Sequence, residues 1–230
     1  MKDIQSGPDD RRINIRKVGV KNLSYPVIVL DKARRAQQTV ALVNMYVNLP
    51  HQFKGTHMSR FVEILHGFHE RFTLSAYRRI LEETRTRLNA GAAHLEMSFP
   101  YFVGEAAPRR YDCRLEGSLG SPDERLDLKV EVAVPLAGPG GTPWGLATVA
   151  VRMRRLLWIE DLIALAESAR LPETPTAAGA CRAIAAALAT EPAITWHRAR
   201  VTERGGGTLG GHASFAESEW PDFWAGAERA

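Results

Sequence analysis

Residues 37–49 read QQTVALVNMYVNL, and their alternation is the clearest fold signal in the first half of the chain. The polar side chains Asn44, Tyr46 and Asn48 share one face of this stretch. A period of two residues indicates a β-strand with one buried face. The stretch therefore predicts a sheet that is covered on one side only. The apolar residues of the buried face are Ala41, Val43, Met45, Val47 and Leu49.

The segments around this strand form an ordered series of strands and helices. Apolar residues recur at helical spacing after residue 59, which indicates amphipathic helices rather than further strands. Alternation returns near residue 94. In chain order we expect strands at 13–20, 26–30 and 37–49, helices at about 59–68 and 74–89, and strands at 94–103 and 110–119.

The same order returns with shorter parts after residue 120. Glycine and proline dominate GPGGTPWG at 138–145, which predicts a hairpin between two strands. This stretch does not open a helix, so we do not interpret it as a phosphate-binding loop. In chain order we expect strands at 126–134 and 146–153, helices at 158–169 and 177–190, and strands at 194–201 and about 212–215.

Two such series predict an α+β fold with two tandem modules. Residues 1–120 form the first ββααββ module with an N-terminal extension, and residues 121–230 form a second, shortened one. Each module is an antiparallel sheet with a helix pair on one face. The exposed sheet edges favour closure by association, so we expect the sheets to join across subunits into an oligomeric barrel. A monomeric two-layer sandwich is the alternative.

Composition and charge restrict the class of partner. The 230 residues include 30 Lys and Arg against 26 Asp and Glu, a net charge of +4 that is too small to indicate nucleic acid. No apolar run approaches the roughly 20 residues of a membrane span, and the first residues do not resemble a signal peptide. We therefore expect a cytoplasmic protein with no membrane partner. Cys113 and Cys181 suit a reducing compartment and are expected to be small core residues.

The most specific motif is KGTHMSRF at residues 54–61. With it the chain resembles the GTP cyclohydrolase IB family, the zinc-containing branch of the tunnelling fold. The resemblance is nearly continuous over the first 120 residues and patchy beyond them. It implies a homotetrameric barrel with active sites between subunits. Further supporting motifs are DIQS at 3–6, KVGVK at 17–21, SFPYF at 98–102, WIEDLI at 158–163 and ITWHRARV at 194–201.

The resemblance also implies a reaction in folate biosynthesis. In that family, water opens the imidazole ring of the guanine of GTP, C8 leaves as formate, and dihydroneopterin triphosphate forms. A zinc ion lowers the pKa of the attacking water. A histidine transfers protons, and a carboxylate holds the N–H edge of the guanine.

The second half departs from the family at most of the positions where this chemistry needs a side chain. The family carries its cysteine ligand and its proton-transferring histidine where residues 133–151 here read AVPLAGPGGTPWGLATVAV. Glu173 is the remaining candidate for the acidic metal ligand, and Ala177 or Ala178 aligns with the purine-binding glutamate. His212 corresponds to the second histidine of the family's closing motif. One histidine cannot hold a catalytic zinc, so we expect this chain alone to bind no metal.

The substrate-facing side of the family site is retained in the first half. The resemblance assigns this role to Lys54, Thr56, His57, Ser59 and Arg60, which lie where a strand leads into a helix. Backbone N–H groups at a helix start favour phosphate, and the two basic side chains add positive charge. The alternative is an ordinary helix start, with Thr56 or Ser59 as N-cap and a solvated Lys/Arg pair.

Four functional hypotheses follow. We favour a degenerate subunit, a pseudoenzyme by itself, that assembles with a complete paralogue and contributes the phosphate-binding side of an interfacial site for GTP or a related purine or pterin triphosphate. Any zinc would then come from the paralogous subunit. The alternatives are a working enzyme with a remodelled metal site, for which His66 and His69 are candidate ligands, a self-associating tunnelling-fold enzyme with altered purine or pterin chemistry, and a structural or regulatory homologue.

Overall fold

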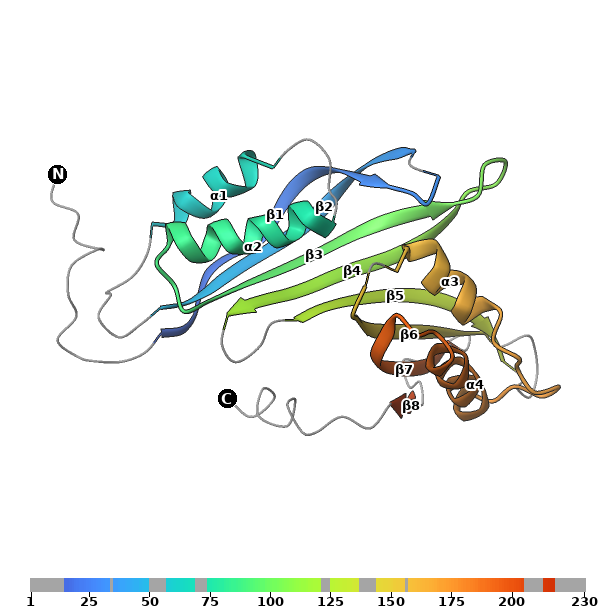
Figure 1. Cartoon of the computed structure of the whole chain (residues 1–230). Coiled ribbons are helices and arrows are strands. Elements are labelled where there is room, and N and C mark those ends of the chain that lie inside the picture. The colour runs from blue at the N-terminus through green and yellow to red at the C-terminus, as the bar shows by residue number, and fades with distance from the viewer. Residues whose placement is uncertain are drawn as a thin grey trace, which may run out of the picture. The chain divides into compact units, whose positions relative to one another are not determined.

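The alternation in the sequence is realised as antiparallel strands that helices cover on one face (Figure 1). The chain divides into two units, Met1–Leu128 and Lys129–Ala230. The computed structural model describes residues 15–33, 35–49, 57–68, 74–120, 125–136, 144–155, 157–204 and 213–217.

Unit 1 is a four-stranded antiparallel sheet with two helices on one face. Its strands follow one another in the order β1-β2-β3-β4, so each strand pairs with its neighbour in sequence. Helices α1 and α2 lie across the same face of this sheet (Figure 1). The elements are β1 (Ile15–Leu30), β2 (Ala36–Leu49), α1 (Met58–His66), α2 (Leu74–Arg87), β3 (Ala92–Val103) and β4 (Arg109–Gly120).

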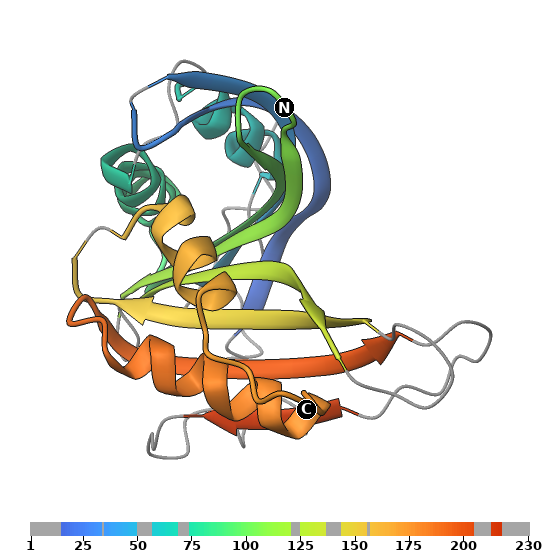
Figure 2. The same cartoon turned by 90° about the vertical axis from the view of Figure 1, so that its right-hand side faces the viewer.

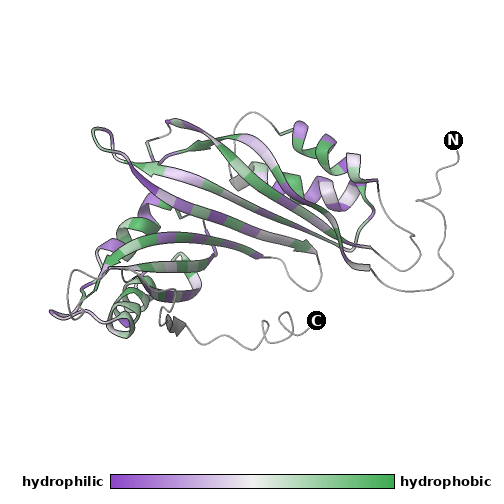
Figure 3. Ribbon diagram, turned by 180° about the vertical axis from the view of Figure 1, so that it is seen from behind, coloured by the Kyte–Doolittle hydropathy of each residue, from purple (hydrophilic) through white to green (hydrophobic). Residues whose placement is uncertain are grey.

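The core of unit 1 lies between this sheet and its helices. Val43 and Met45 of β2 are fully buried, as is Phe61 of α1. Burying a side chain of this size stabilises the folded state by about 1.5–3 kcal/mol. On the helix-free face, Val40 and Leu42 remain 57% and 49% exposed. The strands consequently alternate between hydrophobic and hydrophilic residues, as Figure 3 shows from behind.

Strand β1 differs from the prediction. The sequence indicated two extended segments separated at 21–25, whereas β1 is one strand. It continues through a register shift between Val20 and Leu23. There Asn22 adopts a positive φ of 55°, and its N–H donates to Oδ1 of Asn44 at 2.8 Å. Such a bulge absorbs an extra residue without ending the pairing, but it interrupts the alternation that the prediction relied on.

Unit 2 repeats the order of strands and helices. Strand β5 begins shortly before the boundary between the units, and β5-β6-β7-β8 again follow chain order. Helix α4 packs on β7 and β8, with α3 beside it (Figure 2). This confirms the predicted element order. The elements are β5 (Arg125–Pro135), β6 (Trp144–Met153), α3 (Ile159–Glu167), α4 (Ala177–Ala189), β7 (Ile194–Arg204) and β8 (Ala213–Glu217).

The core of unit 2 follows from the alternation of β5. Val130 and Val132 are fully buried, together with Ile184 of α4. Both cysteines are buried, which confirms the prediction that they are core residues. The thiol of Cys181 donates to the carbonyl of Ala199 on β7 at 3.1 Å.

The strand β6 follows the glycine-rich stretch 138–145, as the hairpin interpretation requires. A phosphate-binding loop would instead lead into a helix. Residues 137–143 lie outside the described residues. The hairpin is therefore established by its two flanking strands, which are neighbours in the sheet.

The described helices are short. The longest, α2, has 14 residues, whereas a membrane-spanning helix needs about 20 apolar residues. Within the described parts of the chain, no helix combines the length and the apolar character needed to cross a membrane.

Candidate nucleotide-binding site

Three of the five predicted substrate-binding residues lie together at the start of α1. His57 occupies the N-cap position with φ −73° and ψ 118°, and Ser59 and Arg60 lie in the first turn. The alternative that Ser59 is the N-cap is wrong, because Ser59 already lies inside the helix. Lys54 and Thr56 lie outside the described residues, so their placement stays a prediction.

The start of α1 is electropositive. No side chain caps it, and its first turn contains no acidic residue. The N–H of Arg60 donates to the carbonyl of His57 at 3.2 Å, which leaves the preceding N–H groups at the helix end. The aligned peptide dipoles add the equivalent of about half a positive charge there. A phosphate group is the typical ligand of such a helix start.

The side chains of this first turn are available to a ligand. Arg60 is half-buried, and its guanidinium makes no ion pair with any acid in the described part of the chain. Glu63, one turn further on, instead pairs with Arg87 of α2, with 3.5 Å between nitrogen and oxygen. Ser59 is exposed. The first turn of α1 therefore carries one arginine without an ion pair among the described residues and one exposed serine.

The helix that carries these residues is held firmly on the sheet. Phe61, Ile64 and Leu65 are buried against unit 1. The hydroxyl of Tyr25 on β1 donates to the carbonyl of Leu65 at 3.1 Å. Burial raises the pKa of Tyr25 above its ordinary value, so this donor keeps its proton. This hydrogen bond ties the last turn of α1 to β1.

The described residues do not fit the zinc ion that the family resemblance implies. A catalytic zinc needs about three protein ligands, and no three His, Cys, Asp or Glu side chains come together in the described ranges. Cys113 and Cys181 are buried and belong to different units. Both ring nitrogens of His94 lie within hydrogen-bonding distance of oxygens in the sheet, at 2.8 and 3.2 Å. His69 and His212 lie outside the described residues.

The start of α4 contains the two alanines at the position where the resemblance predicts a purine-binding glutamate. Ala177 is buried in the first turn, and Ala178 is half-buried beside it. Oγ1 of Thr176 accepts the N–H of Gly179 at 3.1 Å, so this helix start is capped by its own side chain. Glu173 is exposed in the preceding segment. No acidic residue lies in the first turn of α4.

The chain is similar in sequence to proteins of a known family. The model of the family "Type I GTP cyclohydrolase folE2" matches residues 1–139. The chain is 48% identical over 185 residues to the GTP cyclohydrolase FolE2 of Pelobacter propionicus, which covers 73% of this chain and 71% of that protein. It is 37% identical over 268 residues to the FolE2 of Syntrophotalea carbinolica, covering 100% of this chain and 99% of the relative. That alignment is longer than this chain of 230 residues, so the relative has positions without a counterpart here.

A solved structure shows the same fold. The chain is similar to the urate oxidase of Bacillus sp. TB-90, with a TM-score of 0.56 and 7% sequence identity. The match covers 89% of this chain and 98% of that one. At this identity the likeness concerns the fold alone. It confirms the predicted α+β tunnelling fold, whereas the oligomeric barrel stays a prediction.

Proposed function

Because the chain belongs to the GTP cyclohydrolase FolE2 family, we propose that it contributes the phosphate-binding side of a GTP ring-opening site shared with a complete relative. The observation that carries the proposal is the uncapped start of α1, which has no acidic residue in its first turn. It lies inside residues 1–139, the part of the chain that the family model matches. The start of α4 lies outside the family model, although a FolE2 relative aligns over the full chain.

The electropositive start of α1 supports the phosphate-binding role. The triphosphate of GTP is polyanionic, and the helix end, the Arg60 guanidinium and the Ser59 hydroxyl supply donors for it. A hydrogen bond to a charged group contributes about 1.5–3 kcal/mol. Lys54 and Thr56 belong to the same motif and extend this role in the proposal. A ligand without phosphate would lack the oxygens that accept hydrogen bonds from these donors.

The other side of the site would come from the relative. Ring opening needs an activated water, which the zinc of the family supplies when bound. The described residues of this chain do not assemble a ligand set for zinc. Alanines also stand at the start of α4, where the resemblance places the carboxylate that holds the purine. A site between subunits permits this division, because each chain contributes only one of its two sides.

Purification of the chain alone and together with a complete FolE2 relative tests the proposal. Alone, the chain should contain far less than one zinc per subunit and should not convert GTP to the fluorescent pterin product. Together, the two proteins should form a hetero-oligomer in native mass spectrometry. Arg60→Ala in this chain should then raise the KM for GTP of the mixed oligomer. Arg182→Ala, an exposed arginine on α4, is the matched control.

Two outcomes contradict the proposal. One is stoichiometric zinc and GTP turnover by the chain alone, which would indicate a working enzyme with a metal site of its own. The other is a homo-oligomer that converts a purine or pterin nucleotide without the relative. That result would support altered chemistry in a self-associating enzyme.

A further inference from the structure

The KVGVK segment of β1 is shaped in a way that the proposed function does not explain. Its central residues Val18–Val20 pair regularly with β2, and a register shift lies on either side of them. Lys17 lies in the first shift and Lys21 in the second. In each shift β1 contains one residue more than β2, which is the arrangement of a β-bulge. Bulges re-aim side chains and are frequent beside functional sites.

Both lysines converge on one tyrosine ring. The Nζ atoms of Lys17 and Lys21 lie 4.0 and 5.7 Å from the ring centroid of Tyr46. Between them, Gly19 is the register partner of Tyr46. A Cβ at Gly19 would lie 1.8 Å from the carbonyl oxygen of Met45, so only glycine permits this approach of β1 to β2. The close approach brings both ammonium groups over the same ring.

Tyr46 adds a third donor to the two ammonium groups. Its side chain is 4% exposed, and its hydroxyl makes no hydrogen bond within the described part of the chain. Burial raises the pKa of Tyr46, and the nearby carboxylate of Glu96 raises it further. The phenol therefore keeps its proton and remains a hydrogen-bond donor.

The charges around the ring leave an excess of one positive charge. Glu96 accepts two cations, with its oxygens 3.8 Å from Nζ of Lys17 and 3.2 Å from Nη2 of Arg114. Arg114 also contacts Glu116 at 2.6 Å. Lys21 is exposed and has no acidic partner within the described residues. Three cations thus face two carboxylates, and Lys21 carries the uncompensated charge.

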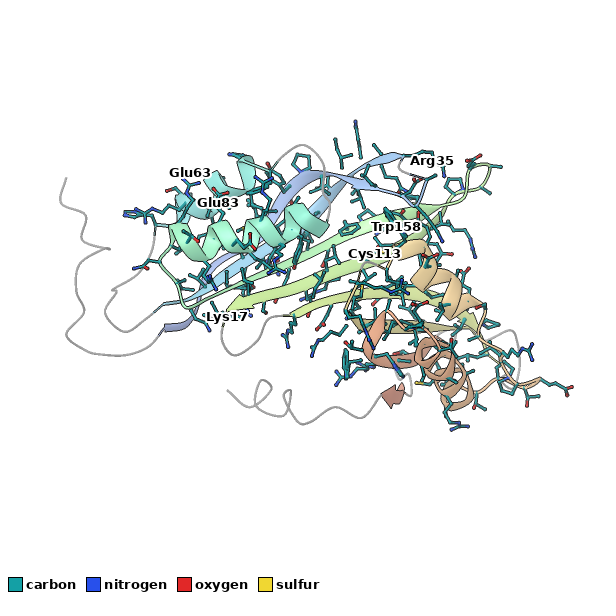
Figure 4. All side chains as sticks on the ribbon, viewed as in Figure 1. Lys17, Arg35, Glu63, Glu83, Cys113 and Trp158 are labelled. Atoms are coloured by element: carbon teal, nitrogen blue, oxygen red, sulfur yellow. The ribbon has the colours of Figure 1, made fainter. Side chains whose placement is uncertain are left out.

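We propose that Lys17, Lys21 and Tyr46 bind a phosphoryl group on the helix-free face of the unit 1 sheet. Ammonium groups only donate hydrogen bonds, and the protonated phenol donates one more. A tetrahedral oxyanion offers several acceptors at once and forms short charge-assisted bonds with such donors. The site is separate from the start of α1, because Tyr46 points away from the helices. In Figure 4, Lys17 comes from β1, whereas Glu63 and Glu83 come from α1 and α2.

Titration of the full chain with inorganic phosphate, GTP and guanosine tests this site. Lys21→Met removes an exposed ammonium group, and Tyr46→Phe keeps the ring while removing its hydroxyl. We expect the first variant to weaken phosphate binding by about 10-fold or more and the second by roughly 3-fold. Lys129→Met in unit 2 is the matched control and should bind as the parent chain does. Guanosine should not compete with phosphate, whereas GTP should if its phosphates are the physiological source.

Several results would overturn the inference. Phosphate and GTP that bind equally well to the parent chain, Lys21→Met and Tyr46→Phe would remove any role for this cluster. Absence of saturable binding of either ligand would do the same. GTP affinity that falls with Arg60→Ala but not with Lys21→Met would refute this site while leaving the proposed function intact. Near-UV circular dichroism of each variant shows whether the fold is retained.

Discussion

Replacement of Ser59 by aspartate distinguishes a phosphate site from an ordinary helix start. Ser59 is exposed in the first turn of α1, which has no acidic residue and no side-chain cap. An aspartate there interacts favourably with the helix dipole, so we expect the folded chain to gain about 0.5 kcal/mol. The same negative charge repels a triphosphate at the helix end. Stability and ligand affinity should therefore change in opposite directions.

The size of both effects follows from the exposure of the site. Two unit charges 4 Å apart interact by about 1 kcal/mol in water and by about 4 kcal/mol at an effective dielectric constant near 20. Ser59 is exposed, so the lower value applies for each nearby phosphate charge. We expect the affinity for GTP to fall by about 5- to 30-fold at low salt. The melting temperature should rise by about 1–2 °C.

Circular dichroism melting and calorimetric titration with GTP, performed on the same preparations, measure the two changes. Ser59→Asn is the control, because it has a similar shape and no charge. Added salt should reduce the loss of affinity, since it screens exposed charges. A higher melting temperature with unchanged GTP affinity would show that the start of α1 is only a helix start. The assignment of Ser59 and Arg60 to phosphate binding would then be wrong.

Two further predictions concern the stability of unit 1. Gly19→Ala places a Cβ 1.8 Å from the carbonyl of Met45, so we expect a loss of about 1–3 kcal/mol in urea denaturation with little change in slope. Tyr77 is fully buried and its hydroxyl donates to the carbonyl of Leu95. Burial raises the pKa of Tyr77 well above its ordinary value, so stability should be complete below about pH 10 and fall as the pH rises beyond it, because the unfolded tyrosine ionises first. Tyr77→Phe should cost about 1 kcal/mol at neutral pH and reduce this alkaline loss; an unchanged pH dependence would contradict the role of Tyr77.

Much of the fold could be predicted because a strand or helix with one buried face carries apolar residues at a characteristic spacing in the sequence. The alternation of Val130, Val132 and Val134 in β5 records which side of the sheet is covered, and all three are buried. The spacing of Phe61 and Ile64 likewise fixed the buried face of α1. Such patterns depend only on the chain itself, so no knowledge of neighbouring strands is needed to interpret them.

The details that position ligands depend on pairing between strands. The sequence contains Lys17 and Lys21 around Gly19, but it does not show that each lysine lies in a bulge or that both ammonium groups lie over the ring of Tyr46. The start of α1 was also misplaced in the capped-helix alternative. A side-chain N-cap contributes only about 1 kcal/mol, which is less than the burial of Phe61 contributes. Packing therefore decides where the helix begins.

The described part of unit 2 has a well-packed core of its own. The fold of unit 2 depends on the buried faces of β5 to β7, whereas the resemblance implies that the family's chemistry depends on the loops and helix starts between them. Random decay would place polar residues at buried positions as well, yet His197 is the single polar side chain among the buried residues that the structure describes in this unit. The structural match covers 89% of the chain, and a FolE2 relative aligns over the full chain although the family model ends at residue 139. An intact core favours continued selection for a folded unit 2, which the proposed shared site requires.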